Sequence, residues 1–421
     1  MLIHFKVSNY KSFKNTVTLN MQKGRAKLKE NHVINRNNLK LLRSAIVYGA
    51  NASGKSNLIN AVSFAKDLII GKIGKVNESL NVPSFMWKTG KPISFEFGIS
   101  LPKRNVRYGF SIKDGYIYEE YLFQMKAKVK EDKMIFKRTA SKKNSFIFAK
   151  KNERKKLIAE NTPKNILFIR QTILNNYDEF KDVYDWINEQ LIVFFTDTTL
   201  CDTFSFSPSD PLYKTRINFI KNVDVGIEDI VIKQLNESEI EKLIGKRLFD
   251  KVKTIPEGDS HLLTNVLDYT IVSKKKGILT AERIVSKHNG ETFSFNDESE
   301  GTRRIFDFLP IFIRKDDGKP ITCLVDEIER SLHIDLLTSL LRLFFENKSE
   351  SQLIATTHQN SLLNTDVFRF DEIWIFNKSR EGVSIINSLD EYKYRYDKNI
   401  EKAYRAGRFG GIPIINTINL K

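Results

Sequence analysis

An eight-residue run near the start of the chain has the residue types and spacing of a phosphate-binding loop. Residues 49–56 read Gly-Ala-Asn-Ala-Ser-Gly-Lys-Ser, which fits G-x-x-x-x-G-K-[ST] without deviation. Its glycines let backbone N–H groups turn toward a β-phosphate, and the N-terminus of a following helix adds positive potential. We expect Lys55 to reach the β- and γ-phosphates and the Ser56 hydroxyl to bind Mg²⁺. The candidate nucleotide-binding residues here are Gly49, Asn51, Ala52, Ser53, Gly54, Lys55, Ser56 and Asn57.

Two elements must position this loop, a strand before it and a helix after it. The apolar run at residues 45–48 predicts the strand, and residues 56–69 (SNLINAVSFAKDLI) have helical spacing of apolar side chains. This strand–loop–helix context favours a phosphate-binding loop over a chance Gly/Lys turn.

A second strand ends in two carboxylates. Residues 321–327 read Ile-Thr-Cys-Leu-Val-Asp-Glu, a short apolar strand followed by Asp326 and Glu327. Adjacent strand residues point to opposite faces, so the two carboxylates can take different roles. We expect Asp326 to hold the Mg²⁺ shell and Glu327 to polarise the attacking water. The alternative is an ordinary strand end with exposed acids, and the presence of Lys55 favours the catalytic pair.

Two further segments can serve the same phosphate chemistry. Residues 298–302 (ESEGT) precede a helical run, where Ser299 and Gly301 can offer a hydroxyl and backbone N–H groups to a phosphate. Residues 353–358 (LIATTH) predict a strand ending in His358, which can contact a γ-phosphate and the water. Alone, the first segment is more often a helix cap and a lone histidine is more often structural. In this order and spacing the two segments support each other.

The four segments together resemble the ABC-type ATPases of the SMC and RecF group. The resemblance is carried by GANASGKS, ESEGT, ITCLVDEIERSLH and ATTHQ. It implies that Ser299 and Gly301 form the signature motif, which meets the nucleotide held by a second protomer. It also implies that Ser331, Leu332 and His333 form the D-loop and that His358 is the switch histidine. Two chains would then sandwich two ATP molecules, with ATP and Mg²⁺ as cofactors.

A narrower resemblance covers most of the chain. SNYKSF at the start, NVDVGIEDI at 222–230, DEIWIF at 371–376 and AYRAGRFGGIPII at 403–415 are similar to the prokaryotic abortive-infection ATPases. That group implies a phage-defence role, with a RloB-type or other Toprim-like protein, or a nuclease, as the partner effector. The glutamine loop of the wider family is not placed: Gln171 is a candidate, and a polar residue on a surface helix is the other interpretation.

A built-in nuclease is not predicted. Residues 283–288 match R-x-x-x-x-H, a pattern of some ribonucleases that belongs on a helix. Here the segment has strand character and runs into Asn289-Gly290, a hairpin turn signal. The long coiled-coil arms of SMC proteins and a zinc hook are also not predicted. A toxic activity is therefore expected on another chain.

Length and composition fit a soluble multidomain protein. The chain has 421 residues, a net charge of +17 and two cysteines, Cys201 and Cys323. This length suggests two or three units, and the few cysteines fit a reducing, cytoplasmic compartment. No apolar run approaches the length of a membrane helix, and the first residues show no secretory signal. The positive charge makes nucleic acid such as DNA, or another polyanion, a candidate partner, and the alternative is that the charge serves solubility alone.

The charge is concentrated in one segment. Residues 126–156 hold 13 Lys/Arg and 3 acidic residues, among short alternating runs between residues 93 and 149 that predict antiparallel strands. Phe136, Phe146 and Phe148 interleave with the basic residues. This is a feature of nucleic-acid grooves, but alternating aromatics also mark the buried face of a strand. Both interpretations stay open.

These observations predict an α/β fold, an ABC-type P-loop ATPase head with an antiparallel β subdomain and a largely helical insertion. Residues 1–150 form the first lobe with the phosphate loop, 151–253 the insertion, and 254–421 the second lobe with the signature, Asp326, Glu327 and His358. The favoured function is an ATP-hydrolysing sensor or switch of an anti-phage system, acting as at least a dimer on a partner effector. The alternatives are a DNA-binding ATPase for repair or maintenance and an ATP-bound scaffold, which would not need Glu327.

Overall fold

The computed structural model describes the chain except for residues 77, 86–89, 127–130, 141–143, 151, 197–211, 224–225, 259, 263–269, 314–318, 365, 393–398 and 413–421. The Ser-, Asp- and Pro-rich run at 202–211, whose composition predicts a loop, lies outside the described residues, as do Cys201 and the lysines at 142, 143 and 151. The chain forms two compact units. Unit 1 comprises Met1–Phe195, Lys319–Ile328 and Glu350–Lys421, and unit 2 comprises Thr196–Gly318 and Glu329–Ser349.

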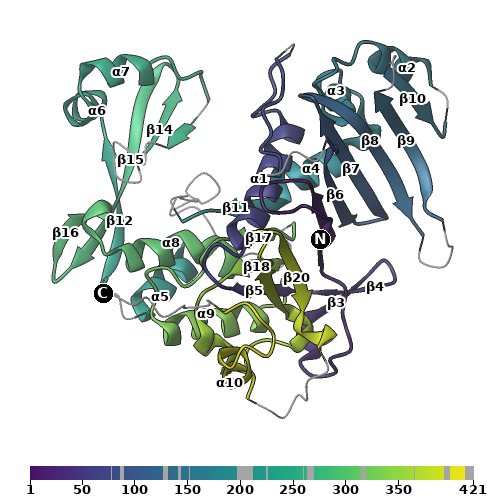
Figure 1. Cartoon of the computed structure of the whole chain (residues 1–421). Helices are drawn as coiled ribbons and strands as arrows, with labels where there is room; N and C mark the ends of the chain where they lie inside the picture. The colour runs from purple at the N-terminus through teal and green to yellow at the C-terminus, as the bar shows by residue number, and fades with distance from the viewer. Residues whose placement is uncertain are drawn as a thin grey trace, which may run out of the picture. The chain divides into compact units, whose positions relative to one another are not determined.

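Unit 1 contains a six-stranded sheet assembled from distant parts of the sequence (Figure 1). Its order is β11 (Leu191–Phe194), β17 (Thr322–Val325), β18 (Gln352–Thr356), β5 (Ser44–Gly49), β19 (Ile373–Lys378) and β20 (Ser384–Ser388). All neighbours are parallel except β19 and β20, which are antiparallel. The central strands β17, β18 and β5 are buried along their whole length, as expected of a parallel sheet covered on both faces. This sheet positions the candidate site.

A seven-stranded antiparallel sheet forms the β subdomain of the same unit. Its order is β10 (Asn144–Phe148), β9 (Lys133–Ala140), β8 (Tyr116–Met125), β7 (Asn105–Lys113), β6 (Ile93–Ser100), β1 (Leu2–Ser8) and β2 (Val17–Asn20). Lys113-Asp114-Gly115 forms the turn that joins β7 to β8, with positive φ at Asp114 and Gly115. The predicted antiparallel strands are therefore confirmed.

The helices of unit 1 cover these sheets. They are α1 (Lys55–Ile70), α2 (Glu153–Glu160), α3 (Phe168–Leu174), α4 (Lys181–Asp185) and α10 (Ile400–Arg405). The unit also contains an antiparallel hairpin of β3 (Val33–Arg36) and β4 (Leu39–Leu42). Buried residues of α1 such as Leu58 and Val62 share one core with Phe95 and Phe97 of the seven-stranded sheet. The phosphate-loop helix is therefore packed inside the main core of the unit.

The three interleaved phenylalanines of the basic segment belong to this core. Phe136 is fully buried, and Phe146 and Phe148 pack against the core while contacting the Phe168 ring. The interpretation as the buried face of a strand is confirmed for Phe136, while Phe146 and Phe148 are partly buried against the same core.

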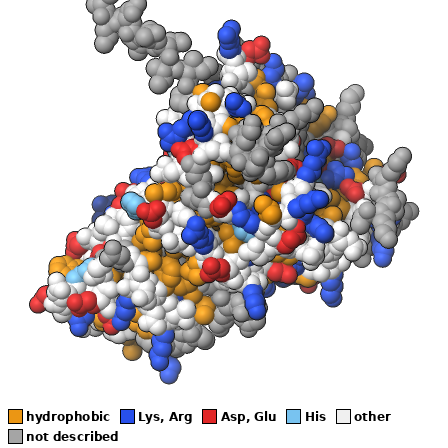
Figure 2. Space-filling view, turned by 90° about the horizontal axis from the view of Figure 1, so that it is seen from below, with side chains coloured by type: hydrophobic (Ala, Val, Ile, Leu, Met, Phe, Trp, Pro, Cys, Tyr) orange, Lys and Arg blue, Asp and Glu red, His pale blue; other side chains and the backbone are white. Residues whose placement is uncertain are grey.

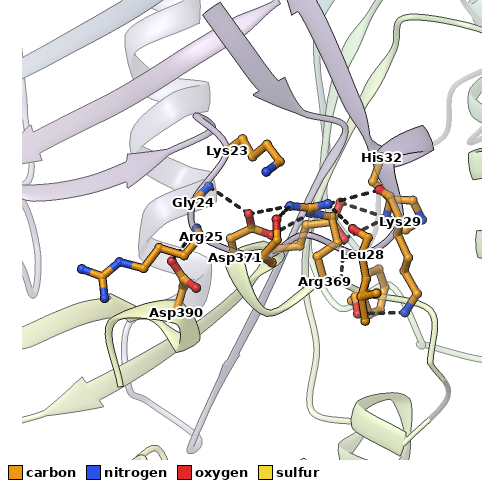
Figure 3. A network of polar contacts seen from close by, with 12 residues as sticks. Lys23, Gly24, Arg25, Leu28, Lys29, His32, Arg369, Asp371 and Asp390 are labelled. Atoms are coloured by element: carbon orange, nitrogen blue, oxygen red, sulfur yellow. Dashed lines mark hydrogen bonds and ion pairs between the residues drawn. The ribbon is translucent and has the colours of Figure 1, made fainter. Parts of the chain in front are cut away.

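A polar network holds an N-terminal loop against the segment that leads into β19 (Figure 3). The Arg369 guanidinium makes two hydrogen bonds to Asp371, at 2.8 and 3.0 Å, and further bonds to carbonyls of residues 26–29. His32 lies 2.9 Å from a Glu372 carboxylate oxygen, and the Gly24 N–H donates to Asp371. Because these groups are almost all buried and paired, the network fastens the two ends of the chain into one unit.

Unit 2 is a smaller α/β unit. Its sheet runs β12 (Asp229–Leu235), β15 (Ile278–His288), β14 (Thr270–Lys275) and β13 (Ser260–Leu262), with β16 (Glu291–Ser294) also paired to β15. Its helices are α5 (Tyr213–Asn222), α6 (Glu237–Ile244), α7 (Lys246–Val252), α8 (Glu300–Phe312) and α9 (Ile334–Glu346). The Arg283–His288 segment lies in strand β15 and not in a helix, and Asn289-Gly290 turns into β16, so the predicted hairpin is confirmed.

The predicted α/β class, with a phosphate-loop sheet and an antiparallel β subdomain, is confirmed. Between residues 151 and 253 the described elements are mainly helices, with β11 and β12 as strands. The division into parts at 1–150, 151–253 and 254–421 stays a prediction. Across the described residues, no helix combines the length and the apolar character needed to cross a bilayer.

Candidate active site

The phosphate loop lies between β5 and α1, in the predicted strand–loop–helix arrangement. Ala52 has φ +59° and Gly54 has φ +114°, so the backbone turns through left-handed conformations before the helix begins. A Cβ at Gly54 would lie 2.4 Å from the Ser384 hydroxyl oxygen, and that hydroxyl donates to the Ser53 carbonyl. Glycine is required at position 54 by both its backbone conformation and this close contact.

Lys55 is held over the loop. Lys55 is the first residue of α1 and is only 5% exposed. Its Nζ donates to the carbonyl oxygens of Gly49 at 2.7 Å and Ala50 at 3.2 Å. Nζ also lies 3.5 Å from Nδ1 of His358. A buried ammonium bonded to carbonyl dipoles can exchange them for phosphate oxygens, which carry full charge.

The two carboxylates follow β17, as predicted. Asp326 is 7% exposed, and the Glu327 side chain is about two-fifths exposed. Glu327 has φ +49°, a left-handed conformation that costs about 1–2 kcal/mol for a residue with a Cβ. Strain of this kind is found where a fold holds a side chain in one functional direction.

Parallel pairing brings these residues together with His358. β18 lies between β17 and β5, so their carboxyl ends meet at one edge of the sheet. This edge is where open α/β sheets bind ligands. Nε2 of His358 lies 3.8 Å from Oε1 of Glu327, so Lys55, His358 and Glu327 form a continuous chain of contacts.

The remaining loop residues fit a bound nucleotide. The Ser53 hydroxyl is buried and has no hydrogen-bond partner among the described residues. Ser56 is exposed in the first turn of α1, and the Asn57 amide donates to Ser12 at 2.8 Å. Asn51 and Ala52 are exposed at the loop tip, and Gly49 ends β5. An unpaired buried hydroxyl beside the open N-terminus of a helix suits an anionic ligand.

The residues also fit Mg²⁺ in the manner typical of phosphate sites. The described residues contain no group of three or more His, Cys, Asp or Glu side chains that could hold a metal ion by themselves. Mg²⁺ needs few protein ligands there, because water and phosphate oxygens complete its shell. Ser56 and Asp326 remain the predicted protein ligands.

The predicted signature lies in unit 2. Ser299 caps α8, with its hydroxyl accepting the Thr302 N–H at 3.0 Å and lying 2.8 Å from the Thr302 hydroxyl. A Cβ on Gly301 would lie 2.6 Å from the Ser331 carbonyl oxygen, so the signature helix and the D-loop are in direct contact. Arg330 pairs with Glu300 at 3.1 Å across the same contact.

The D-loop residues lead from this contact into α9. Ser331 has φ +62°, Leu332 follows it, and His333 caps α9 by accepting the Asp335 N–H at 3.4 Å. Ser299, Ser331 and His333 are all exposed, and Leu332 is half-buried. The signature and D-loop thus form one surface feature of unit 2.

An ion pair between His288 and Glu298 holds the segment just before the signature. Nε2 of His288 lies 2.6 Å from Oε1 of Glu298, the residue before Ser299, and the Ser286 hydroxyl donates to the same oxygen. The hydrogen bond to Glu298 raises the pKa of His288 above its ordinary value of 6.5. The segment before the cap is therefore held partly by charge.

Three site contacts had no signal in the sequence. The Ser12 hydroxyl, in the SNYKSF segment, accepts a hydrogen bond from the Asn57 amide. The Ser384 hydroxyl of β20 donates to the Ser53 carbonyl beside Gly54. Lys378 of β19 donates to the Ala52 carbonyl at 3.0 Å. Gln171, the glutamine-loop candidate, lies half-buried on α3, and its role stays a prediction.

The sheet, the loop and the carboxylate pair together define a P-loop ATPase of the α/β class. Residues 44–364 match the family described as "AAA domain, putative AbiEii toxin, Type IV TA system". The match covers well over half of the chain, and the chain belongs to this family. No curated protein matches the chain.

Among solved structures, heads of SMC proteins are similar to this chain. An SMC head bound to the C-terminal winged-helix domain of ScpA has 16% identity and a TM-score of 0.42, covering 92% of this chain and 97% of the head. The SMC head domain of Thermotoga maritima has 13% identity and a TM-score of 0.36, with coverages of 92% and 98%. An SMC head with an extended coiled coil from Pyrococcus furiosus, bound to the C-terminal domain of ScpA, has 13% identity and a TM-score of 0.37, with coverages of 97% and 98%.

Proposed function

We propose that the chain binds ATP with Mg²⁺ and hydrolyses it, as the switch of an anti-phage, abortive-infection system. The observation that carries the proposal is the meeting of Lys55, Asp326, Glu327 and His358 at the carboxyl edge of one sheet. Family membership supports nucleotide chemistry, and the family description names a toxin of a toxin–antitoxin system.

The roles of the residues follow from their positions. Lys55 and the backbone N–H groups at the start of α1 bind the β- and γ-phosphates and offset their charge. Glu327 orients and polarises the attacking water, and His358 binds the γ-phosphate between Lys55 and Glu327. Ser56 and Asp326 hold Mg²⁺, which neutralises charge that develops on the phosphate oxygens. The left-handed backbone of Glu327 orients its carboxylate toward His358 before ATP binds, so this side chain needs little reorientation during the reaction.

A second copy of the chain completes the site in this proposal. Ser299 and Gly301 bind the γ-phosphate held by the partner protomer, so two chains enclose two nucleotides. The exposed signature cap and the adjoining D-loop of unit 2 support this arrangement. Binding of ATP closes the dimer and hydrolysis opens it, and this cycle gates a partner effector in the cytoplasm, a nuclease or Toprim-like protein.

The alternative is a DNA-binding ATPase for repair or maintenance, which the net charge of +17 favours. The basic segment supports it less than its sequence suggests. Arg138 is buried and donates to the carbonyls of Pro163 and Ile166, and buried Lys155 pairs with Glu179 at 2.8 Å. On the face in Figure 2, Lys and Arg side chains are interspersed with Asp and Glu.

ATP turnover of the purified chain with and without duplex DNA tests both functions, with Glu327→Gln as the blank. Turnover above this blank and unaffected by DNA supports a switch controlled by a protein partner or a phage product. Stimulation by DNA that falls with added salt supports the DNA-binding alternative. Turnover no greater than that of the blank contradicts hydrolysis at this site.

A further inference from the structure

Thr356, the last residue of β18, contacts both carboxylate residues of the site. Its hydroxyl donates to Oδ1 of Asp326 at 2.5 Å and accepts the backbone N–H of Glu327 at 2.9 Å. A threonine hydroxyl has one proton to donate and lone pairs to accept, so one group satisfies both contacts. Thr356 is 0% exposed, which gives these bonds the strength of a dry environment.

The contacts lie where the β17–β18 ladder ends. The last regular pair is Val325 with Ala355, and beyond it the Thr356 hydroxyl takes the Glu327 N–H while its carbonyl takes the Ile328 N–H at 3.1 Å. Two successive N–H groups of the turn are therefore bound by one residue. The left-handed backbone of Glu327 lies between them, so Thr356 stabilises the strained turn that aims the Glu327 carboxylate at His358.

We propose that Thr356 is a positioning residue that couples Mg²⁺ binding at Asp326 to the orientation of Glu327. The proposal rests on the proposed function. The Thr356 hydroxyl holds the Asp326 carboxylate through Oδ1 and the Glu327 backbone through its N–H. A shift of either group is therefore transmitted to the other. Groups that orient metal ligands in this way typically change metal affinity or activity by about 10- to 100-fold when they are removed.

The neighbouring threonine shows that this role belongs to one position. Thr357 is equally buried, but its backbone N–H pairs with Val47 of β5, and its hydroxyl accepts the Gln359 N–H. Both threonines adjoin Val47 of β5, but only the Thr356 hydroxyl contacts the two carboxylate residues. The sequence ATTHQ alone does not distinguish the two.

The test compares Thr356→Val, which keeps the shape and removes the hydroxyl, with Thr356→Ser, which keeps the hydroxyl. Thr322→Val is the matched control, because Thr322 is a buried threonine at the opposite end of β17 whose hydroxyl donates to Gln352. Calorimetry measures the affinity of each variant for the ATP analogue AMP-PNP in MgCl₂ and in EDTA. Melting temperatures in EDTA report folding.

In Thr356→Val we expect the gain in affinity that Mg²⁺ provides to fall about 10- to 100-fold, with the affinity in EDTA unchanged. Thr356→Ser should restore the gain to within about threefold, and Thr322→Val should retain it. An unchanged Mg²⁺ gain in Thr356→Val, or equal losses in MgCl₂ and EDTA, would overturn the proposal. If Thr356→Val does not fold, Thr356→Cys, whose thiol is a weaker donor, is expected to show a loss in the same direction, and a full gain there would overturn it.

The readout separates this inference from the proposed function. A wild-type chain that binds AMP-PNP with Mg²⁺ but hydrolyses no ATP contradicts the hydrolysis and still tests Thr356. A wild-type chain that binds no nucleotide overturns both proposals at once.

Discussion

The phosphate-loop edge of unit 1 and the signature helix of unit 2 differ in how much of a nucleotide site each contains. In unit 1, Lys55, Asp326, Glu327 and His358 converge from three parallel strands. Buried hydrogen bonds hold Lys55 and Asp326. In unit 2, the Ser299 hydroxyl is occupied in capping its own helix, and Gly301 packs on Ser331. We therefore propose that the first region binds phosphate by itself and that the second binds a nucleotide held by another protomer.

The difference also concerns the supports of the two regions. Thr356 fixes the unit 1 carboxylates from the dry interior of a sheet. The segment before the signature is fixed by His288 and Glu298, of which His288 is about one quarter exposed. Because a histidine is charged only when it is protonated, the strength of this pair depends on pH, so we infer that nucleotide capture in unit 1 is robust and that engagement of the signature is adjustable by pH.

The largest effect is expected from Lys55→Ala. Removal of the ammonium leaves the phosphates without charge-assisted bonds, each of which contributes about 1.5–3 kcal/mol, so ATP affinity should fall roughly 100-fold or more. Calorimetry measures it, and Lys40→Ala, an exposed lysine of β4, is the control. Retention of wild-type affinity in Lys55→Ala would show that unit 1 is not the capturing region and would break the comparison.

Glu327→Gln should separate capture from turnover. The amide cannot accept a proton from water, and loss of such a group typically lowers the rate about 10²- to 10⁴-fold. ATP affinity should stay close to wild type, because Lys55 and the loop are intact. Steady-state turnover and calorimetry measure the two quantities, with exposed Glu381→Gln as control. Turnover equal to that of the control would remove the proposed role of Glu327.

The sequence predicts the unit 1 site well because its chemistry lies at the ends of short apolar strands. A loop of fixed spacing before α1 and two acids after β17 need only parallel pairing to meet, and parallel strands align their carboxyl ends. The hairpin at Asn289-Gly290 was predictable for a similar reason, since those residues favour positive φ.

Other contacts depend on register between strands that lie far apart in the chain. That Thr356, and not Thr357, faces Asp326 follows from the pairing of Val325 with Ala355. The support of Gly54 by Ser384 follows from β20 lying at the sheet edge next to β19. The aromatic residues of the basic segment were ambiguous because strand alternation is the same whether a face meets a core or a ligand, and packing against Phe168 and Phe180 decides it for Phe136.

Gly301→Ala should weaken dimerisation through the signature of unit 2 without changing nucleotide binding by unit 1. The new Cβ would lie 2.6 Å from the Ser331 carbonyl, so the signature helix and D-loop must separate. Overpacking of this kind costs about 1–3 kcal/mol. In a Glu327→Gln background we expect ATP-driven dimerisation to weaken roughly tenfold, while AMP-PNP affinity of the monomer stays the same.

Sedimentation velocity with and without ATP measures this effect, and Lys242→Ala, an exposed residue of α6, is the control in the same unit. Equal dimerisation of Gly301→Ala and the control would contradict a role of the signature between protomers. A parallel loss of monomer affinity would show that the two regions are not separable.

The smallest effect is expected from His288→Asn, which tests whether the signature support is adjustable by pH. The pKa of His288 is raised above 6.5 by its hydrogen bond to Glu298, and the Glu228 carboxylate adds to the shift. Because the folded state binds this proton more tightly than the unfolded state, the ion pair contributes its full stability below pH 6.5, and the contribution is lost as pH rises through the folded pKa. We expect wild type to melt about 1–3 °C above His288→Asn at pH 6, with the difference vanishing at high pH. A pH-independent difference would mean that His288 acts through packing against Phe293, and the support of unit 2 would then be as fixed as that of unit 1.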